Sequence, residues 1–470
     1  MAEQSPRTIR LPKMSRDVFL EHLKLSGLLD GKDFDTVIGG LSNAPRGRVL
    51  ARELVEKGYL TRFQAELLLA GRTHGFILGQ YRILEEIGRG GMGRVFKAEH
   101  QTMSRVVALK ILDPKLTKTD RARLLFQREV KAAAKLNHPN IVTAFDANQI
   151  ADRCYLVMEY VDGPNLSDFV KKHGPLPVTQ AADFIRQAAL GLQFAHDLGM
   201  VHRDIKPANL LVQKNTSKSA ANSFTVKILD FGLARLSTSD DGTIDNSETI
   251  LTNKQSVMGT PDYLAPEQAR NIHSVDARSD LYSLGCTFYF LVTGQVPFVG
   301  GTAFEKLVRH TTEIPRTAQQ VNPSVPDVIS EIIERLMAKD PDDRFQSGAE
   351  LAAVLSMLGQ PEQGSWIDVK PLAQESEISL GSSNFLPRPT EIEIPSDIDE
   401  LWASLEDDPS NASTNTLTGD QSKTTVNNTD TIRKLKHADH LNWILTGVIL
   451  IVLILAVLGI RALTHQFDNG

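Results

Sequence analysis

The sequence has little cysteine, few aromatic residues and no excess of positive charge. Its 470 residues include two cysteines and 6% aromatic residues, and the formal net charge is −6. Cys154 and Cys286 both lie in apolar runs, which favours buried reduced thiols over a disulfide. No zinc-ligand spacing occurs, and the mild acidity offers no basic surface to nucleic acid. We therefore expect neither a disulfide scaffold, nor a zinc protein, nor a nucleic-acid-binding protein.

Charged residues are missing altogether from one long run, residues 441–460. A helix of about 20 residues is about 30 Å long, which matches the hydrocarbon core of a bilayer. The alternative is a buried helix of a globular domain, but an uncharged run of this length is hard to bury there. Three basic residues precede the run at 433–436 and Arg461 follows it, so the preceding part is predicted to be cytoplasmic. The sequence thus predicts a single-pass protein of the cell membrane, with residues 461–470 as a short extracytoplasmic tail.

Composition divides the rest of the chain into four parts. Residues 1–13 are polar and charged, so we expect a disordered N-terminus without a signal peptide. Residues 14–75 show helical spacing of Leu, Val and Phe between glycine-marked turns, which predicts a small helical module with helices over 17–29, 47–57 and 61–70. Residues 359–436 are rich in Ser, Thr, Asn, Pro and acidic residues, which predicts a disordered linker, within which 392–405 could form a short docking helix. The fourth part, residues 81–358, carries the chemistry.

The string HRDIKPAN at residues 202–209, followed by DFG at 230–232, places a base, a cation and two metal ligands close together in sequence. Phosphoryl transfer from ATP needs this set, because its catalysis consists of positioning and charge stabilisation. Asp204 would accept the proton of the attacking hydroxyl, and Lys206 would steady the transferred phosphoryl group. Asn209 and Asp230 would hold the metal ion. Each string alone is common, so the interpretation depends on further motifs in the required order.

The string IGRGGMGRV at residues 87–95 predicts a glycine-rich loop between strands at 81–87 and 94–100. Because Gly88, Gly90 and Gly93 lack side chains, backbone amides can approach phosphate oxygens closely. A GxGxxG string also occurs in dinucleotide-binding folds, but there it opens a helix, whereas here it joins two strands.

One lysine, Lys110, interrupts the apolar run at 106–112, which is predicted to be a buried strand. A buried ammonium needs a partner of opposite charge. The candidate partner is Glu129, in a predicted helix at 121–136. The alternative for Glu129 is a solvated position on a surface helix.

With these motifs in this order, the chain resembles the eukaryotic-like serine/threonine protein kinases of bacteria, of the membrane-anchored PknB type. The resemblance implies an α+β bilobal protein kinase fold, with an antiparallel β-sheet N-lobe and a mainly helical C-lobe, between the helical module and the transmembrane helix. It implies ATP and Mg²⁺ as cofactors, with Mn²⁺ as an alternative, and catalytic roles for Lys110 and Glu129. Protein Ser/Thr hydroxyls are the implied acceptors, because Lys206 follows the Ser/Thr rather than the Tyr kinase pattern. Besides the loop glycines and Lys110, the implied nucleotide pocket comprises Ile87, Val95, Ala108, Met158, Glu159, Val161 and Leu211.

The resemblance also implies a switch in the polar stretch after DFG, which corresponds to an activation loop. Thr252 is the first choice for its phosphorylation, followed by Thr249 and Ser256, and Arg203 would pair with the phosphate. The alternative for each hydroxyl is a merely solubilising role. Thr260 would bridge toward the catalytic base and lysine within a platform for the acceptor peptide.

Two contacts of the C-lobe are implied as structural. Glu267 is expected to pair with Arg344, and Asp280 is expected to anchor the catalytic loop. The predicted function is ATP-dependent phosphorylation of Ser/Thr on proteins, the chain itself included. The alternative is a nucleotide-binding, membrane-anchored scaffold with little catalysis, and a small-molecule kinase is disfavoured by the peptide platform. The resemblance also allows a homodimer formed through the N-lobe.

Overall fold

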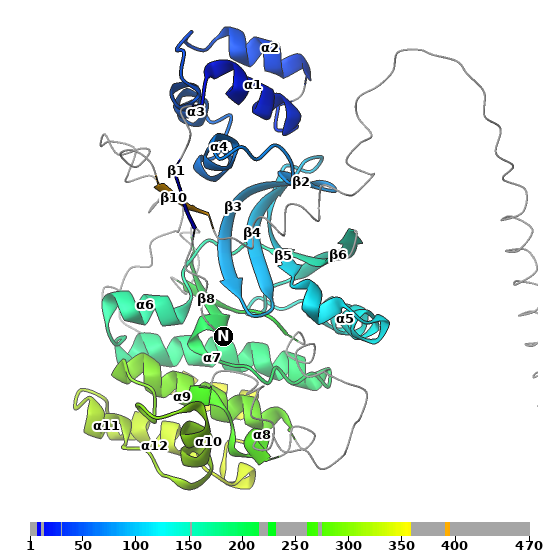
Figure 1. Ribbon diagram of the computed structural model, residues 1–470. Coiled ribbons are helices and arrows are strands. Elements are labelled where there is room, and N and C mark those ends of the chain that lie inside the picture. The colour runs from blue at the N-terminus through cyan, green and yellow to red at the C-terminus, as the bar shows by residue number, and fades with distance from the viewer. Residues whose placement is uncertain are drawn as a thin grey trace, which may run out of the picture. The chain divides into compact units, whose positions relative to one another are not determined.

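The computed structural model describes residues 7–10, 14–29, 31–150, 153–215, 224–231, 261–270, 275–358 and 391–394 (Figure 1). The predicted membrane-spanning run at 441–460 and the hydroxyls of Thr249, Thr252, Ser256 and Thr260 lie outside these residues. Within the described ranges, no helix has the length and apolar character needed to cross a bilayer.

The described part of the N-terminal module is built from helices α1 (Arg16–Leu25), α2 (Gly31–Gly39), α3 (Gly47–Glu56) and α4 (Arg62–Leu69). The apolar spacing predicts α1, α3 and α4, although α1 ends earlier than expected, where the Ser26 N–H donates to the His22 carbonyl. The pattern does not predict α2, because glycine at both of its ends disfavours a helix. Packing of Val37 into the hydrophobic core of the module provides the stability that the low helix propensity of α2 does not.

The N-lobe is a six-stranded antiparallel sheet in the order β2-β3-β4-β5-β7-β6. Its strands are β2 (Ile77–Leu78), β3 (Tyr81–Gly90), β4 (Gly93–His100), β5 (Arg105–Leu112), β6 (Ala144–Ile150) and β7 (Arg153–Glu159). Strands β3 and β4 extend further than the sequence predicts, through Gly88, Gly90 and Gly93, so the glycine-rich loop is the end of a long hairpin.

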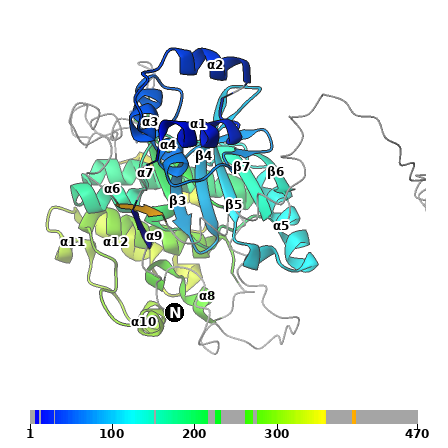
Figure 2. The same ribbon diagram turned by 45° about the horizontal axis from the view of Figure 1, so that its top comes forward.

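The module covers one face of this sheet. Val107, Leu109 and Ile111 of β5 point to that face, since side chains alternate along a strand. They share a hydrophobic core with helices of the module, in which Leu54 and Leu68 are fully buried. Figure 2 shows α1 and α4 over β3 and β4, and α4 contacts β3 directly. The module and the sheet are therefore halves of one core.

The opposite face of the sheet packs against helix α5 (Asp120–Ala133). Ala108 and Leu112 of β5 form a second hydrophobic cluster there with Phe126 of α5. Lys110 follows the same alternation and is only 5% exposed, so its side chain lies on the α5 face, as a buried cation within an apolar strand.

The C-lobe is mainly helical, with a core formed around α7 (Val178–Asp197) and α9 (Ala277–Thr293). Its other helices are α6 (Leu166–His173), α8 (Pro266–Arg270), α10 (Ala303–Thr312), α11 (Ala318–Val321), α12 (Asp327–Leu336) and α13 (Gly348–Ser356). Short 3₁₀ turns lie at η1 (Pro114–Thr117), η2 (Pro207–Asn209), η4 (Pro261–Tyr263) and η6 (Pro341–Asp343). The hairpin of β8 (Leu210–Lys214) and β9 (Phe224–Ile228) completes the lobe. The predicted bilobal α+β fold is confirmed.

One further strand pair joins distant parts of the sequence. Strand β1 (Arg7–Arg10) pairs antiparallel with β10 (Glu391–Ile394), with Ile9 opposite Ile392. Alternation of isoleucine with other residues is the two-residue period of a strand. These short strands fall in ranges for which composition predicts disorder, and β10 occupies the start of the range considered for a docking helix.

Candidate active site

The catalytic loop is held by Asp280, which lies on α9 and is fully buried. Its two carboxylate oxygens accept hydrogen bonds from the backbone N–H of His202 at 2.8 Å and of Arg203 at 2.7 Å. His196 Nε2 lies 2.9 Å from the same carboxylate. Arg203 has a φ of +69°, which non-glycine residues rarely adopt, and the bond to its N–H stabilises this conformation. The contact implied for Asp280 is therefore present.

Burial would raise the pKa of the Asp280 carboxyl, but hydrogen bonds and positive charge from its histidine neighbours outweigh burial. The pKa consequently lies below its usual range, so the group is a carboxylate at neutral pH.

The proposed base, Asp204, is fixed by two of the residues predicted to act with it. Lys206 Nζ donates to Asp204 Oδ2 at 2.8 Å. Asn209 Nδ2 donates to the Asp204 backbone carbonyl at 2.7 Å and to Asp204 Oδ2 at 3.1 Å. The structure thus brings base, cation and amide together within one short loop.

His202 connects this loop to the strand end that precedes the DFG aspartate. Its Nε2 donates to the Leu229 carbonyl at 2.6 Å, and its Nδ1 accepts from the Asp204 N–H at 3.2 Å. The ring of Phe231 meets the His202 ring edge-on at 4.7 Å between centroids. Sequence reasoning quotes His202 only as part of a motif and misses this role.

Lys110 and Asp230 join the two lobes. Lys110 Nζ lies 2.7 Å from Asp230 Oδ2. Asp230 has a φ of +63°, a left-handed conformation. Burial would raise the pKa of the Asp230 carboxyl, but the Lys110 ammonium outweighs burial and holds the pKa below its usual range. Asp230 is therefore ionised at neutral pH and can act as a cation ligand.

Glu129 lies on α5 and is buried, at 7% exposure, rather than solvated. The ion pair that Lys110 forms in the structure is with Asp230, and the pairing of Lys110 with Glu129 that the resemblance implies stays a prediction. Which way α5 faces depends on its packing against the sheet, and no sequence pattern specifies that.

The residues implied for the adenine pocket come from both lobes. Val95, Ala108 and Met158 belong to one hydrophobic cluster next to α5, whereas Leu211 is half-buried on β8 of the C-lobe. Glu159 follows them along β7, and its carboxylate pairs with Lys227 at 2.9 Å. With its side chain engaged, Glu159 would contact a nucleotide through its backbone. Val161 is buried at 4% exposure, and Ile87, at the other end of the pocket, is 38% exposed.

The glycines of the loop meet different constraints. Gly93 has a φ of +136°, and a Cβ there would lie 2.0 Å from the carbonyl oxygen of Ile111. Gly93 is thus required by the packing of β4 against β5, a reason different from the phosphate approach that the sequence suggests. A Cβ on Gly88 would lie 3.7 Å from Val95, and one on Gly90 would meet no atom within 4 Å. Open space around Gly90 is compatible with close approach of a ligand.

Gly163, just after the segment between the lobes, is a required residue that sequence reasoning misses. A Cβ on Gly163 would lie 1.8 Å from the carbonyl oxygen of Val212 on β8. The adjacent Pro164 carbonyl accepts from the Val212 N–H at 2.9 Å, so the two segments are held in contact. The Asp-Gly-Pro-Asn string signals a turn, but not the strand that approaches it.

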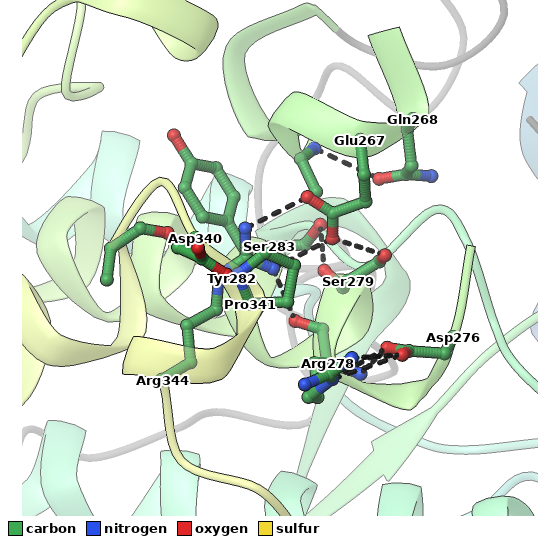
Figure 3. Close-up of polar contacts among 12 residues, drawn as sticks. Glu267, Gln268, Asp276, Arg278, Ser279, Tyr282, Ser283, Asp340, Pro341 and Arg344 are labelled. Carbon is green, nitrogen blue, oxygen red and sulfur yellow. Dashed lines mark hydrogen bonds and ion pairs between the residues drawn. The ribbon is translucent and has the colours of Figure 1, made fainter. Parts of the chain in front are cut away.

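The ion pair expected between Glu267 and Arg344 is present and has two parallel bonds, at 2.8 and 2.9 Å (Figure 3). The Arg344 side chain has no exposed surface. Ser279 Oγ donates to the same glutamate at 2.5 Å, and the guanidinium lies 4.9 Å from the ring centre of Tyr282. Burial would raise the pKa of Glu267, but Arg344 outweighs it, so the pKa is lowered.

The residues expected to hold a divalent cation fit such an ion. Both amide N–H contacts of Asn209 go to Asp204, so its side-chain oxygen is the atom left for a cation. Asp230 Oδ2 binds Lys110, which leaves Oδ1. Hard oxygen donors of this kind suit Mg²⁺, which usually takes one or two protein ligands and completes its shell with phosphates and water. Accordingly, no cluster of three or more His, Cys, Asp or Glu side chains suited to a metal occurs among the described residues.

The fold and these contacts define a class of protein. A sequence model of the family described as "Protein kinase domain" matches residues 81–354, and the chain belongs to this family.

Curated relatives are named serine/threonine-protein kinases. The chain is 37% identical over 316 residues to PknB of Mycobacterium leprae, covering 66% of this chain and 48% of the relative. It is 39% identical over 280 residues to PknB of Mycolicibacterium smegmatis, covering 59% and 42%. The solved kinase domain of Mycobacterium tuberculosis PknI aligns with a TM-score of 0.45 at 25% identity, covering 60% of this chain and 98% of that chain. The chain thus spans less than half the length of these curated relatives.

Proposed function

We propose that this protein is a serine/threonine protein kinase that transfers the γ-phosphoryl group of ATP to hydroxyls of proteins, its own activation loop included. The observation that carries the proposal is that the structure assembles two groups of charged and polar side chains. Asp204 with Lys206 and Asn209 forms one, and Lys110 with Asp230, across the two lobes, forms the other.

In this proposal each group has a separate task. The Asp204 carboxylate accepts the proton of the Ser or Thr hydroxyl as its oxygen bonds to phosphorus and the bond to the ADP oxygen breaks. Lys206, already 2.8 Å from Asp204, adds positive charge where the phosphoryl group passes. Asn209 and Asp230 would hold Mg²⁺, which supplies charge neutralisation of the triphosphate when bound. Lys110 orients Asp230.

We also propose that the protein is anchored in the cell membrane by residues 441–460, with the kinase domain in the cytoplasm and the C-terminus outside. The uncharged run and the basic residues before it support this arrangement. Digestion of a C-terminal tag by external protease in intact cells, with the kinase domain protected until the cells are opened, is the expected result. A C-terminal tag that is protected in intact cells and digested only in opened cells would contradict the orientation.

A homodimer through the N-lobe is proposed on the resemblance alone. It would have to use a surface other than the sheet face that the module covers, because Leu109, Phe96 and their neighbours are already buried there. Sedimentation of the soluble portion at several concentrations tests it, and a monomer throughout would exclude the proposal.

The decisive experiment for the activity uses residues 1–430 with labelled ATP and Mg²⁺, beside Lys110→Met and Asp204→Asn. Phosphosites are then mapped by mass spectrometry. Label on Ser and Thr of the wild type alone supports a protein kinase and identifies the switch among Thr252, Thr249 and Ser256. ATP binding by all three proteins without any label would instead favour the scaffold function.

A further inference from the structure

The N-terminus of α4 is joined to the edge of β3 by side-chain hydrogen bonds. Gln64 Nε2 donates to the Ile83 carbonyl at 2.6 Å, and Thr61 Oγ1 donates to the Leu84 carbonyl at 2.5 Å. The two side chains also cap the helix reciprocally. The Thr61 N–H donates to Gln64 Oε1 at 2.9 Å, and the Gln64 N–H donates to Thr61 Oγ1 at 3.2 Å. Gln64 is 2% exposed, so both side chains are held in fixed orientations.

These bonds fall where β3 departs from regular pairing. The register with β4 shifts between Ile83 and Glu85 and again between Glu86 and Gly88, so Leu84 and Ile87 are the extra residues of two bulges. On its other edge, β3 pairs with β2 only at Tyr81 and Arg82. The Ile83 N–H still donates to the Phe76 carbonyl at 2.8 Å, and at the carbonyls of Ile83 and Leu84 the side chains of Gln64 and Thr61 take the place that a neighbouring strand would have.

We propose that Thr61 and Gln64 are positioning residues for the glycine-rich loop and thereby set the affinity for the triphosphate of ATP. A bulge increases the local twist of a strand, so its direction beyond the bulge is sensitive to what holds the bulge. Strand β3 runs from the two held carbonyls through Ile87 directly into Gly88 and Gly90. The helical module thus acts on the nucleotide site through the part of β3 that leads into the glycine-rich loop.

This inference rests on the proposed function, because it assumes that the loop holds phosphates. The test compares the Kd of Mg-ATP with that of adenosine, by calorimetry, for the full-length wild type, Thr61→Val and Gln64→Leu. The Kd of ATP is expected to rise about three- to tenfold, the usual effect of one lost hydrogen bond. The Kd of adenosine is expected to stay the same, because adenosine has no phosphates. Thr61→Ser, which keeps the hydroxyl, is expected to bind ATP as the wild type does.

The matched control is Thr317→Val, which removes the same kind of cap from α11. There the Gln320 N–H donates to Thr317 Oγ1 at 3.2 Å, and the residue is half-buried, as Thr61 is, and distant in sequence from β3. Both affinities should be unchanged in this variant. If Gln64→Leu does not fold, Thr61→Val, which leaves the buried amide in place, decides the outcome.

Three results would overturn the inference: an unchanged ATP affinity in Thr61→Val, an equal loss of ATP and adenosine affinity, or a wild type that binds adenosine as tightly as ATP. The second result would mean that the cap only stabilises the lobe. A wild type that binds ATP through its phosphates but transfers none would refute the proposed function while leaving the positioning role intact.

Discussion

At the scale of single residues, the site is organised by buried or half-buried carboxylates that each have their own source of positive charge. Asp230 has the Lys110 ammonium, Asp280 has backbone N–H groups and a histidine, and Glu267 has Arg344. A buried carboxylate without such partners would bind a proton and lose its function. In all three the pKa is lowered in spite of burial, so these groups stay charged.

The Asp230 carboxylate is expected to be indispensable for transfer but not for folding. Asp230→Asn keeps the shape of the side chain while removing the cation ligand and the partner of Lys110. We expect kcat to fall by more than about a hundredfold, the effect typical of losing one preorganised charge in an active site. Circular dichroism should be unchanged. The control is Asp168→Asn, an exposed carboxylate on α6, which should keep full activity. Normal turnover of Asp230→Asn would refute its role as a ligand.

His310 is expected to make the stability of the C-lobe depend on pH. It is fully buried on α10, its Nδ1 lies 2.8 Å from the Tyr282 hydroxyl, and burial together with the charge of Lys339 lowers its pKa from 6.5 to about 3. Below pH 6.5 the unfolded chain binds a proton here that the folded chain does not bind until about pH 3. Stability is therefore complete above pH 6.5 and is lost as the pH falls from 6.5 toward 3.

The measurement is the free energy of unfolding by urea at several pH values. His310→Gln should flatten its dependence on pH between pH 4 and 6.5 by up to about 1.4 kcal/mol per pH unit. His173→Gln on α6, where the histidine is exposed, should run parallel to the wild type. Parallel curves for His310→Gln as well would show that His310 does not titrate in this way.

At the scale of elements, close contact between backbones explains several positions that carry no chemistry. Gly93 lets β4 approach β5, and Gly163 lets the segment between the lobes approach β8. Strand β8 also carries Leu211, an implied wall of the adenine pocket.

Gly163→Ala is accordingly expected to disturb both stability and nucleotide binding. The added Cβ would lie 1.8 Å from the Val212 carbonyl, so β8 must move away. Overpacking of this kind typically costs about 1–3 kcal/mol, and we expect a lower melting temperature and weaker ATP binding. Gly39→Ala on α2 is the control, because no atom lies within 4 Å of its Cβ and its φ is ordinary. Equal melting temperatures of the two variants would show that the segment between the lobes adjusts without a loss of stability.

The sequence predicts those features that depend on local order and misses those that depend on packing between elements. The Asp204 loop and the glycine-rich hairpin follow from residue types at fixed spacing, whereas the Glu267–Arg344 pair is implied by the resemblance alone. The ion pair of Lys110 with Asp230 does not follow from spacing, because it depends on how the two lobes pack together. Helix α2 is missed for the same reason, since packing rather than propensity stabilises it.

At the scale of the whole molecule, the helical module and the N-lobe sheet share one hydrophobic core. An apolar stripe on α4 shows that this helix must be covered, but not that β3 to β5 cover it. Leu67, Leu68 and Leu69 are all buried in this core together with Ile83 and Phe96. The sheet therefore has an apolar face that the module, and not solvent, covers.

It follows that the module and the sheet should unfold together. Leu68→Ala removes a fully buried side chain from α4, and such substitutions typically cost about 2–5 kcal/mol. Because the core is shared, hydrogen exchange should become faster in β3, β4 and β5 as well as in α4. Leu124→Ala on α5, where the leucine is 58% exposed, is the matched control and should change neither stability nor exchange in the sheet. Faster exchange confined to the module in Leu68→Ala would mean that the module is an independent folding unit, and its hydrogen bonds to β3 would then be too easily broken to position the loop.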